Sequence, residues 1–205
     1  MTNVAVIYYS STGHVHTLAE SAAAAAGKAG AEVRLRRVAE TAAEATIATS
    51  PEWAEHLAAT GGVAVAQVED LDWADVILFG TPTRFGLPAA QLKAFIDSTG
   101  ELWQQGRLVN KVVSSFTSTS TSHGGQESTL LALNNTFYHW GAIIVAPGYA
   151  DPVQFATGNG NPYGTSHISH DDTTPPGEEN LSAIEFQARR TVEIATALKT
   201  GMQAA

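Results

Sequence analysis

The sequence predicts an α/β fold, a doubly wound parallel sheet of five strands in the order 2-1-3-4-5 with helices on both faces. Short apolar runs alternate along the chain with longer helical patterns, as in successive strand–helix–strand units. Three of the runs lead directly into polar loops. No repeat or low-complexity linker divides the 205 residues. We therefore expect a single domain over residues 1–205, long enough to bury a proper core.

The individual elements follow from the apolar runs and the patterns between them. Ala22 to Ala26 give the first helix small side chains that allow close packing against the sheet. Residues 39–73 contain scattered Glu, two Trp and a Gly pair, which indicates a partly helical excursion. In chain order we expect strand 3–9, helix 14–29, strand 31–37, strand 75–80, helix 87–99, strand 111–116, helix 125–140, strand 142–147 and helix 179–199.

The first polar loop joins the first strand to the first helix and reads Tyr8-Tyr9-Ser10-Ser11-Thr12-Gly13-His14-Val15. Unpaired N–H groups at a helix start, together with hydroxyl donors, form a site for an anion. The loop has neither the lysine of a triphosphate-binding loop nor a G-x-G-x-x-G pattern. It therefore suits a ligand with one terminal phosphate, such as flavin mononucleotide (FMN). The alternative is an ordinary serine-rich turn and helix N-cap.

Two more polar loops follow the third and fourth expected strands, at residues 81–86 and 117–127. The carboxyl ends of parallel strands lie at one edge of a sheet, so all three loops should converge where the strand order reverses. Thr83 to Gly86 would offer donors to a flat heterocycle, and Ser118 to Thr121 would cap its far side. A chain that merely has polar loops after its strands would look similar.

Five motifs together resemble those of the WrbA family of flavodoxin-like NAD(P)H:quinone oxidoreductases, over nearly the whole chain. The motifs are Tyr8-Tyr9-Ser10 with Gly13-His14, Gly80-Thr81-Pro82-Thr83-Arg84-Phe85-Gly86, Thr99-Gly100 with Leu102-Trp103, Gly124-Gly125-Gln126-Glu127, and Gly148-Tyr149-Ala150. The resemblance implies a flavodoxin-like fold that binds FMN.

The resemblance also implies roles for particular residues. Trp103 matches an aromatic residue on the substrate side, Thr12 stands at a position beside the nicotinamide, and His139 matches a residue that reaches a neighbouring subunit's flavin. The implied FMN-binding residues are Ser10, Ser11, Thr12, Gly13, His14 and Val15 for the phosphate, Pro82, Thr83, Arg84, Phe85 and Gly86 for the isoalloxazine, and Ser118, Thr119, Ser120, Thr121 and His139 for the rest of the pocket.

The expected activity is two-electron reduction of a quinone by NADH or NADPH. Hydride would pass through N5 of the flavin in a ping-pong cycle, so that no side chain acts as a catalytic group and no metal is needed. The resemblance further implies a homo-oligomer, either a dimer or a tetramer. The main alternative is a flavodoxin-type electron carrier that docks to redox proteins, which an acidic surface would suit. A flavin-free binding protein is a third possibility.

Composition excludes other classes. The chain has no cysteine, so disulfides and thiolate chemistry are absent. A net charge of −9 disfavours nucleic-acid binding. Arg34, Arg36 and Arg37 alternate along an expected strand and fit its solvent side, or an edge of the sheet, better than a binding patch. With no signal-like start and no long apolar segment, we expect no membrane insertion and a cytoplasmic location.

The segment from Asp151 to Asn180 is rich in Gly, Asn, Pro, Ser and His and shows little periodicity. Long loops of this kind are often functional. Its 158–164 part resembles a family segment near the active site and the subunit contact. His167, His170, Asp171 and Asp172 could form a metal cluster, but we expect solvated loop polarity instead, because the run has no helical register.

Overall fold

The sheet of the computed structural model, which describes residues 1–204, has the predicted strand order. Five parallel strands run in the order β2-β1-β3-β5-β6, which is the predicted 2-1-3-4-5 when only these strands are counted. The flavodoxin-like order is therefore confirmed. Its strands are β1 (Asn3–Tyr8), β2 (Glu32–Arg37), β3 (Val76–Arg84), β5 (Val112–Thr119) and β6 (Ile143–Ile144).

Two short strands extend the sheet to seven, so the prediction of five strands was incomplete. β4 (Leu87–Pro88) pairs antiparallel with the end of β3, and β7 (Ser166–Ile168) pairs parallel with the end of β5. Strands of two and three residues are too short to produce a readable alternation. They form because backbone groups of β3 and β5, both longer than expected, offer them partners.

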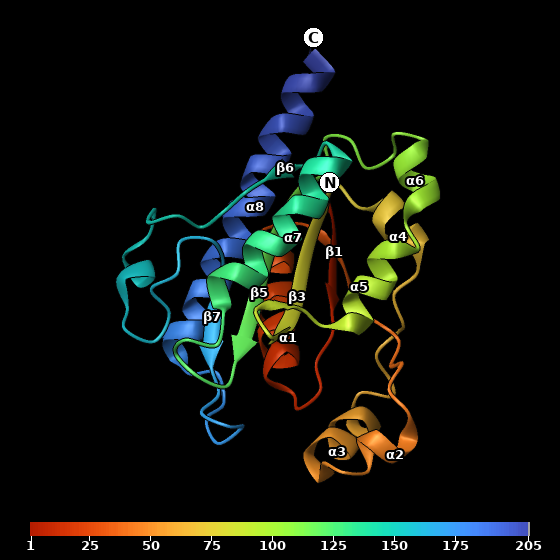
Figure 1. Ribbon diagram of the computed structural model, residues 1–205. Coiled ribbons are helices and arrows are strands. Elements are labelled where there is room, and N and C mark those ends of the chain that lie inside the picture. The colour runs from red at the N-terminus through yellow and green to blue at the C-terminus, as the bar shows by residue number, and fades with distance from the viewer. Residues whose placement is uncertain (205) are drawn as a thin grey trace.

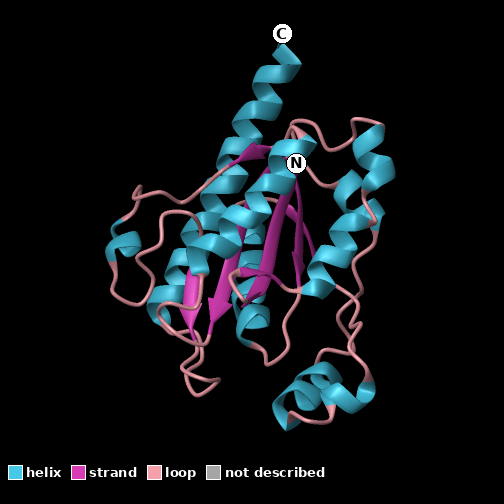
Figure 2. Cartoon of the chain, viewed as in Figure 1, coloured by secondary structure: helices cyan, strands magenta, loops and turns pink. Residues whose placement is uncertain are grey.

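The helices enclose the sheet from both sides (Figure 1, Figure 2). The helix expected at 87–99 begins later, at Ala90, because the preceding residues are taken into β4. The last helix runs beyond the expected residue 199. The helices are α1 (His14–Lys28), α2 (Glu44–Ile47), α3 (Pro51–Ala59), α4 (Val68–Trp73), α5 (Ala90–Asp97), α6 (Gly100–Gln104), α7 (Gln126–Trp140), the 3-10 helix η1 (Pro152–Phe155) and α8 (Glu178–Ala204).

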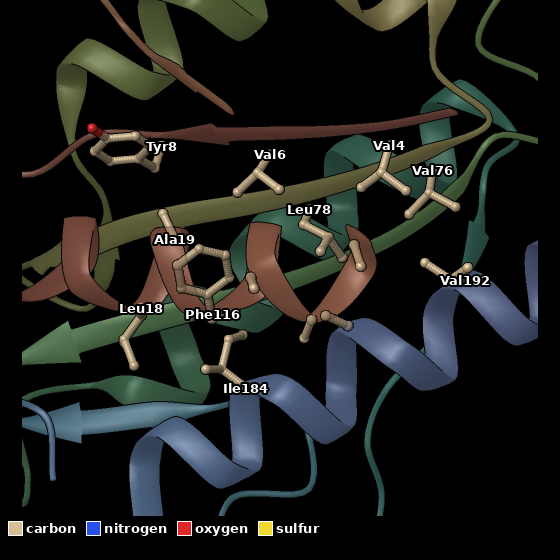
Figure 3. Packing of buried hydrophobic residues seen from close by; sticks show 14 of the residues in the cluster. Val4, Val6, Tyr8, Leu18, Ala19, Val76, Leu78, Phe116, Ile184 and Val192 are labelled. Atoms are coloured by element: carbon tan, nitrogen blue, oxygen red, sulfur yellow. The ribbon is translucent and has the colours of Figure 1, made fainter. Parts of the chain in front are cut away.

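Helices α1 and α8 pack on one face of the sheet (Figure 3). Ala19, Ala22 and Ala26 are fully buried, so the small side chains of α1 do allow the close approach expected from the sequence. Phe116 and Ile184 fill the space between the strands and the two helices. Helices α4, α5 and α7 cover the other face, and their apolar side chains form a second core.

The excursion between β2 and β3 is partly helical, as predicted, and Glu40 ties it to the sheet. Glu40 Oε2 accepts hydrogen bonds from Tyr9 Oη at 2.8 Å and from Trp53 Nε1 at 3.0 Å, and Oε1 accepts one from Gln91 Nε2 at 2.7 Å. One carboxylate therefore joins the residue that follows β1 to α3 and α5. Helices α2 and α3 lie beyond the strand ends to which the arrowheads point (Figure 1).

The arginines of β2 stabilise the edge of the sheet. Arg34 and Arg36 both donate to the buried carboxylate of Asp70, at 3.1 Å each, and Asp70 belongs to α4. The interpretation of this cluster as an edge-strand feature is confirmed, since β2 is the outermost strand. Within residues 1–204 no helix combines the length and the apolarity needed to cross a bilayer.

Replacing Gly80 by Ala should destabilise the fold. A Cβ at Gly80 would lie 2.5 Å from the ring of Phe116 and 2.9 Å from Val15 Cγ1, and overpacking of this kind costs about 1–3 kcal/mol. Urea unfolding measures the change. As a matched control, Gly27→Ala adds the same methyl group to α1 where no atom lies within 4 Å, and it should raise the free energy of unfolding by up to about 1 kcal/mol. Equal effects of the two substitutions would contradict the packing described here.

Candidate functional site

The three polar segments predicted from the sequence meet in one cavity of ≈ 80 Å³. It lies where β1, β3 and β5 end beside the start of α1. A fourth segment, after β7, also contributes and was not predicted to. The lining residues are Ser10, Ser11, Thr12, His14, Val15, Pro82, Thr83, Arg84, Ser118, Thr119, Ser120, Ser169 and Asp172.

The first segment forms a tight turn into α1. Gly13 has φ of +100°, in the left-handed region that favours glycine. Its N–H donates to Ser10 Oγ at 3.0 Å, which closes the turn. No side chain caps α1, so the N–H groups of its first turn are available to a ligand at the positive end of the helix dipole. This segment can hold an anion without a lysine.

The second segment continues β3 as far as Arg84 and is less loop-like than expected. Thr83 Oγ1 lies 2.7 Å from Thr129 Oγ1 and donates to Gly124 O at 3.2 Å, which fixes it against the third segment. Arg84 Nη2 donates to Ser11 Oγ at 3.1 Å. The guanidinium therefore joins the first two segments and places a positive charge at the edge of the cavity.

Phe85 and Gly86 form the turn between β3 and β4 and do not line the cavity. Both have left-handed backbones, with φ of 54° and 77°, and this conformation is a genuine outlier for a bulky residue such as Phe85. The ring of Phe85 is fully exposed. The turn thus presents an uncovered aromatic side chain beside the cavity at the expense of backbone strain.

The third segment is only partly the loop that was predicted. Ser118 and Thr119 are buried residues of β5, because β7 pairs with them at the edge. Ser120 lines the cavity, whereas Thr121 is exposed and does not. The Thr121 carbonyl instead accepts from Thr119 Oγ1 at 2.9 Å. The pairing with β7 is what turned the expected loop into strand.

Asp172 is the residue that reasoning from the sequence missed. Its Oδ1 accepts a hydrogen bond from Thr12 Oγ1 at 2.8 Å and lies 3.0 Å from His14 Nε2. The Asp172 side chain is 45 % exposed, so the expectation of solvated loop polarity holds for it in part, although it did not include the contact with Thr12. The same expectation was wrong for His167, which is buried in β7. Among residues 1–204 no three His, Asp or Glu side chains gather as metal ligands would. The sequence signal was the Asp-Asp pair in a long polar loop, which does not reveal the contact with Thr12.

His167 lies behind the cavity, in β7. It is 2 % exposed, its Nδ1 is 2.9 Å from Ser118 Oγ, and its ring centroid is 5.1 Å from that of His14. Burial lowers the pKa of the His167 imidazole to about 4, and His14 adds to the effect. The imidazole is therefore neutral at pH 7 and serves as a hydrogen-bonding partner that orients Ser118.

Trp103 and His139 lie together in a separate surface groove between α5, α6 and α7. Trp103 Nε1 donates to the backbone carbonyl of His139 at 2.9 Å, and the groove volume is ≈ 410 Å³. Within one chain neither residue lines the cavity. These two predicted site residues are thus brought to each other but not to the three polar segments.

Comparison with known proteins identifies relatives over nearly the full length. The family described as NADPH-dependent FMN reductase matches residues 2–155. A protein from Deinococcus radiodurans named NAD(P)H dehydrogenase (quinone) is 44 % identical over 195 residues, which cover 95 % of this chain and 96 % of the relative. One of the same name from Syntrophus aciditrophicus is 45 % identical over 199 residues, covering 94 % and 97 %.

Solved structures share the fold. The crystal structure of a flavodoxin, WrbA-like protein from Agrobacterium tumefaciens superimposes with a TM-score of 0.65 at 25 % identity, covering 96 % of this chain and 99 % of the other. Two-electron reduced flavodoxin from Megasphaera elsdenii gives a TM-score of 0.57 at 18 % identity, covering 93 % and 98 %. The second likeness supports the fold alone.

Lowering the pH should destabilise the protein partly through His167. An unfolded histidine takes up a proton near pH 6.5, whereas His167 in the folded state does so only near pH 4. Between these values the unfolded state binds more protons. As the pH is lowered through this range, the free energy of unfolding therefore decreases by up to about 1.4 kcal/mol per pH unit for this group. Denaturant unfolding at several pH values measures the slope.

The variant His167→Asn should show a shallower slope over that range than the unmodified protein. His56 contributes equally to both, since burial also lowers its pKa to about 4. The matched control is His123→Asn, which changes an exposed histidine and should keep the original slope. Identical slopes for all three proteins would contradict a neutral, buried His167.

Proposed function

This chain belongs to the WrbA family of NAD(P)H dehydrogenases (quinone), and we propose that it uses FMN to reduce quinones with NADH or NADPH. The family resemblance seen in the sequence motifs is confirmed by the relatives that are 41–45 % identical over nearly the whole chain and by the match to the FMN reductase family. The protein is an FMN-dependent oxidoreductase.

The observation that carries the proposal is the anion-accepting cradle, which is formed by residues 10–15 at the start of α1. The Asp172 carboxylate already accepts a hydrogen bond from Thr12 in this cradle and lies beside His14, which shows that its donors suit a negatively charged oxygen. The phosphate of FMN presents oxygens of the same kind. The residues present therefore fit the cofactor.

We assign the cofactor contacts as follows. Residues 10–15 hold the phosphate, residues 82–86 contact the isoalloxazine, and residues 118–121 complete the pocket. His139 approaches the flavin of a neighbouring subunit. Trp103 and Thr12 contact substrate. The exposure of the Phe85 ring and the tethering of Thr83 by Thr129 support the second assignment.

Bound FMN supplies the two-electron chemistry, accepting a hydride from the nicotinamide and passing it to the quinone. The side chains bind and orient the reactants rather than form bonds to them. Arg84 is held by Ser11, so its positive charge stays beside the cavity. Ser118 is oriented by the neutral His167. Nicotinamide and quinone would bind at the same site in turn, which would give ping-pong kinetics.

The second candidate function, a flavodoxin-type electron carrier, rests on the shared fold and the net charge of −9. The full-length relatives named NAD(P)H dehydrogenase (quinone) favour the enzyme. A flavin titration of the purified protein distinguishes them. We expect bound FMN, anaerobic bleaching by NADH or NADPH, recovery of the oxidised spectrum on adding benzoquinone, and parallel double-reciprocal plots.

Each outcome of that experiment is informative. Bound FMN that neither nucleotide bleaches would favour the carrier. Intersecting double-reciprocal lines would overturn the ping-pong cycle while leaving the enzyme in place. Failure to bind FMN at high micromolar concentration would overturn the proposed function.

We further propose one FMN-binding domain per chain and a homo-oligomer, a dimer or a tetramer. The Trp103–His139 groove shares no lining residue with the cavity of its own chain, and three aromatic side chains, Tyr138, Tyr149 and Phe155, are exposed on the surface. Assembly would bring one chain's groove to another chain's cavity and so complete the site.

The variant His139→Ala should weaken FMN binding about fivefold, as expected for loss of one hydrogen bond worth roughly 1 kcal/mol. Sedimentation velocity should show a multimer for both the variant and the unmodified protein, and circular dichroism checks that the variant folds. A monomeric protein whose FMN affinity is unchanged by the substitution would contradict the shared site.

A further inference from the structure

The turn after β7 places the side chain of Asp172 in the cradle, although this turn is far from the cradle in the sequence. Asp172 Oδ1 accepts from Thr12 Oγ1 at 2.8 Å and lies 3.0 Å from His14 Nε2, and 160 residues separate Thr12 from Asp172. Asp172 and Thr12 both line the cavity. A carboxylate and a phosphate oxygen seek the same donors, so they compete for this position.

The turn has a defined and strained shape. His170, Asp171 and Asp172 have φ values of 48°, 57° and 65°, a left-handed run that side chains with a Cβ adopt reluctantly. The turn is held by Thr174 N–H, which donates to Ser169 O at 2.9 Å, and by Asp172 N–H, which donates to Ser169 Oγ at 3.2 Å. These bonds direct the Asp172 carboxylate toward Thr12, so the contact is built by the turn.

Charge makes the competition strong. A phosphate placed at Thr12 and His14 would meet the Asp172 carboxylate at the same atoms, and two like charges cannot share one site without mutual destabilisation. The Arg84 guanidinium, which also lines the cavity, donates to Ser11, and among residues 1–204 it forms no ion pair with Asp172. The carboxylate must therefore move away before a phosphate can bind.

We propose, on the basis of the function proposed above, that Asp172 determines the specificity of this site by occupying the phosphate position in the ligand-free protein. A ligand must displace it. FMN gains contacts to its ring and ribityl chain in addition to the contacts of its phosphate. Inorganic phosphate gains only the phosphate contacts. Asp172 therefore excludes small free anions and weakens FMN binding, but does not affect riboflavin, which brings no phosphate.

The experiment compares three proteins without bound flavin: the unmodified chain, Asp172→Asn and Asp171→Asn. Asparagine has nearly the same shape as aspartate and tolerates left-handed backbone at least as well, so the strain of the turn is preserved. Asp171→Asn is the matched control, because Asp171 has the same backbone conformation and makes no hydrogen bond or ion pair within residues 1–204. Flavin fluorescence quenching gives the Kd for FMN and for riboflavin.

Asp172→Asn should bind FMN about tenfold more tightly than the unmodified protein and riboflavin with unchanged affinity. Asp171→Asn should match the unmodified protein for both ligands. Asp172→Gly, which accommodates φ of 65° without strain and also lacks the carboxylate, should repeat the gain for FMN. FMN affinity that is unchanged or weaker in both Asp172 variants would overturn the proposal.

A second measurement is independent of flavin binding. Millimolar inorganic phosphate should raise the Tm of Asp172→Asn but not that of the unmodified protein or of Asp171→Asn. If no protein binds FMN, the proposed function fails, and the phosphate measurement alone decides the role of Asp172. The absence of a phosphate-induced Tm shift in Asp172→Asn would then overturn the proposed role of Asp172.

Discussion

The parallel pairing of β1, β3 and β5 is the constraint on which the site depends. Tyr8 pairs with Gly80, and Gly80 pairs with Phe116, so the three strands are in register where β1 ends. Parallel direction then sends the following segments to the same edge of the sheet. Gly80 allows the close fit beneath them, because Phe116 and Val15 leave no room for a side chain there. Residues far apart in sequence thus share one small cavity.

The cavity offers an anion mostly neutral groups. The chain is acidic, with a net charge of −9, and the cradle relies on hydroxyls, helix N–H groups and one histidine, with Arg84 at its edge. Triphosphates depend on a lysine and a metal ion for charge compensation. No lysine lines this cavity, and in the part of the chain that the structure describes no three His, Asp or Glu side chains gather as metal ligands would. An internal carboxylate can fill such a cradle, as Asp172 does, because the donors fit one anionic oxygen regardless of its source.

The sequence was sufficient for the strand order and for the convergence of three polar segments, since both follow from local patterns and from the geometry of parallel sheets. It was insufficient where a structure depends on distant partners. β7 exists because β5 offers backbone groups to Ser166–Ile168, and it takes Ser118 and Thr119 out of the expected loop. Asp172 reaches Thr12 across 160 residues, a contact that no local periodicity encodes. The groove of Trp103 and His139 was likewise placed by helix packing rather than by motif.

Backbone strain is concentrated at the same end of the molecule. Of the five non-glycine residues with positive φ among residues 1–204, four are Phe85, His170, Asp171 and Asp172, in the two turns that adjoin the cavity. The sheet and its two cores contain none of them, and the side chains of these four residues are exposed. Strained turns persist only where the surrounding structure fixes them, and they tend to occur where ligands bind. The turn that carries Asp172 is closed by its own hydrogen bonds to Ser169, and the contact with Thr12 is the part that another anion can replace. Such a replacement displaces the turn, whereas the strands beneath it need not move.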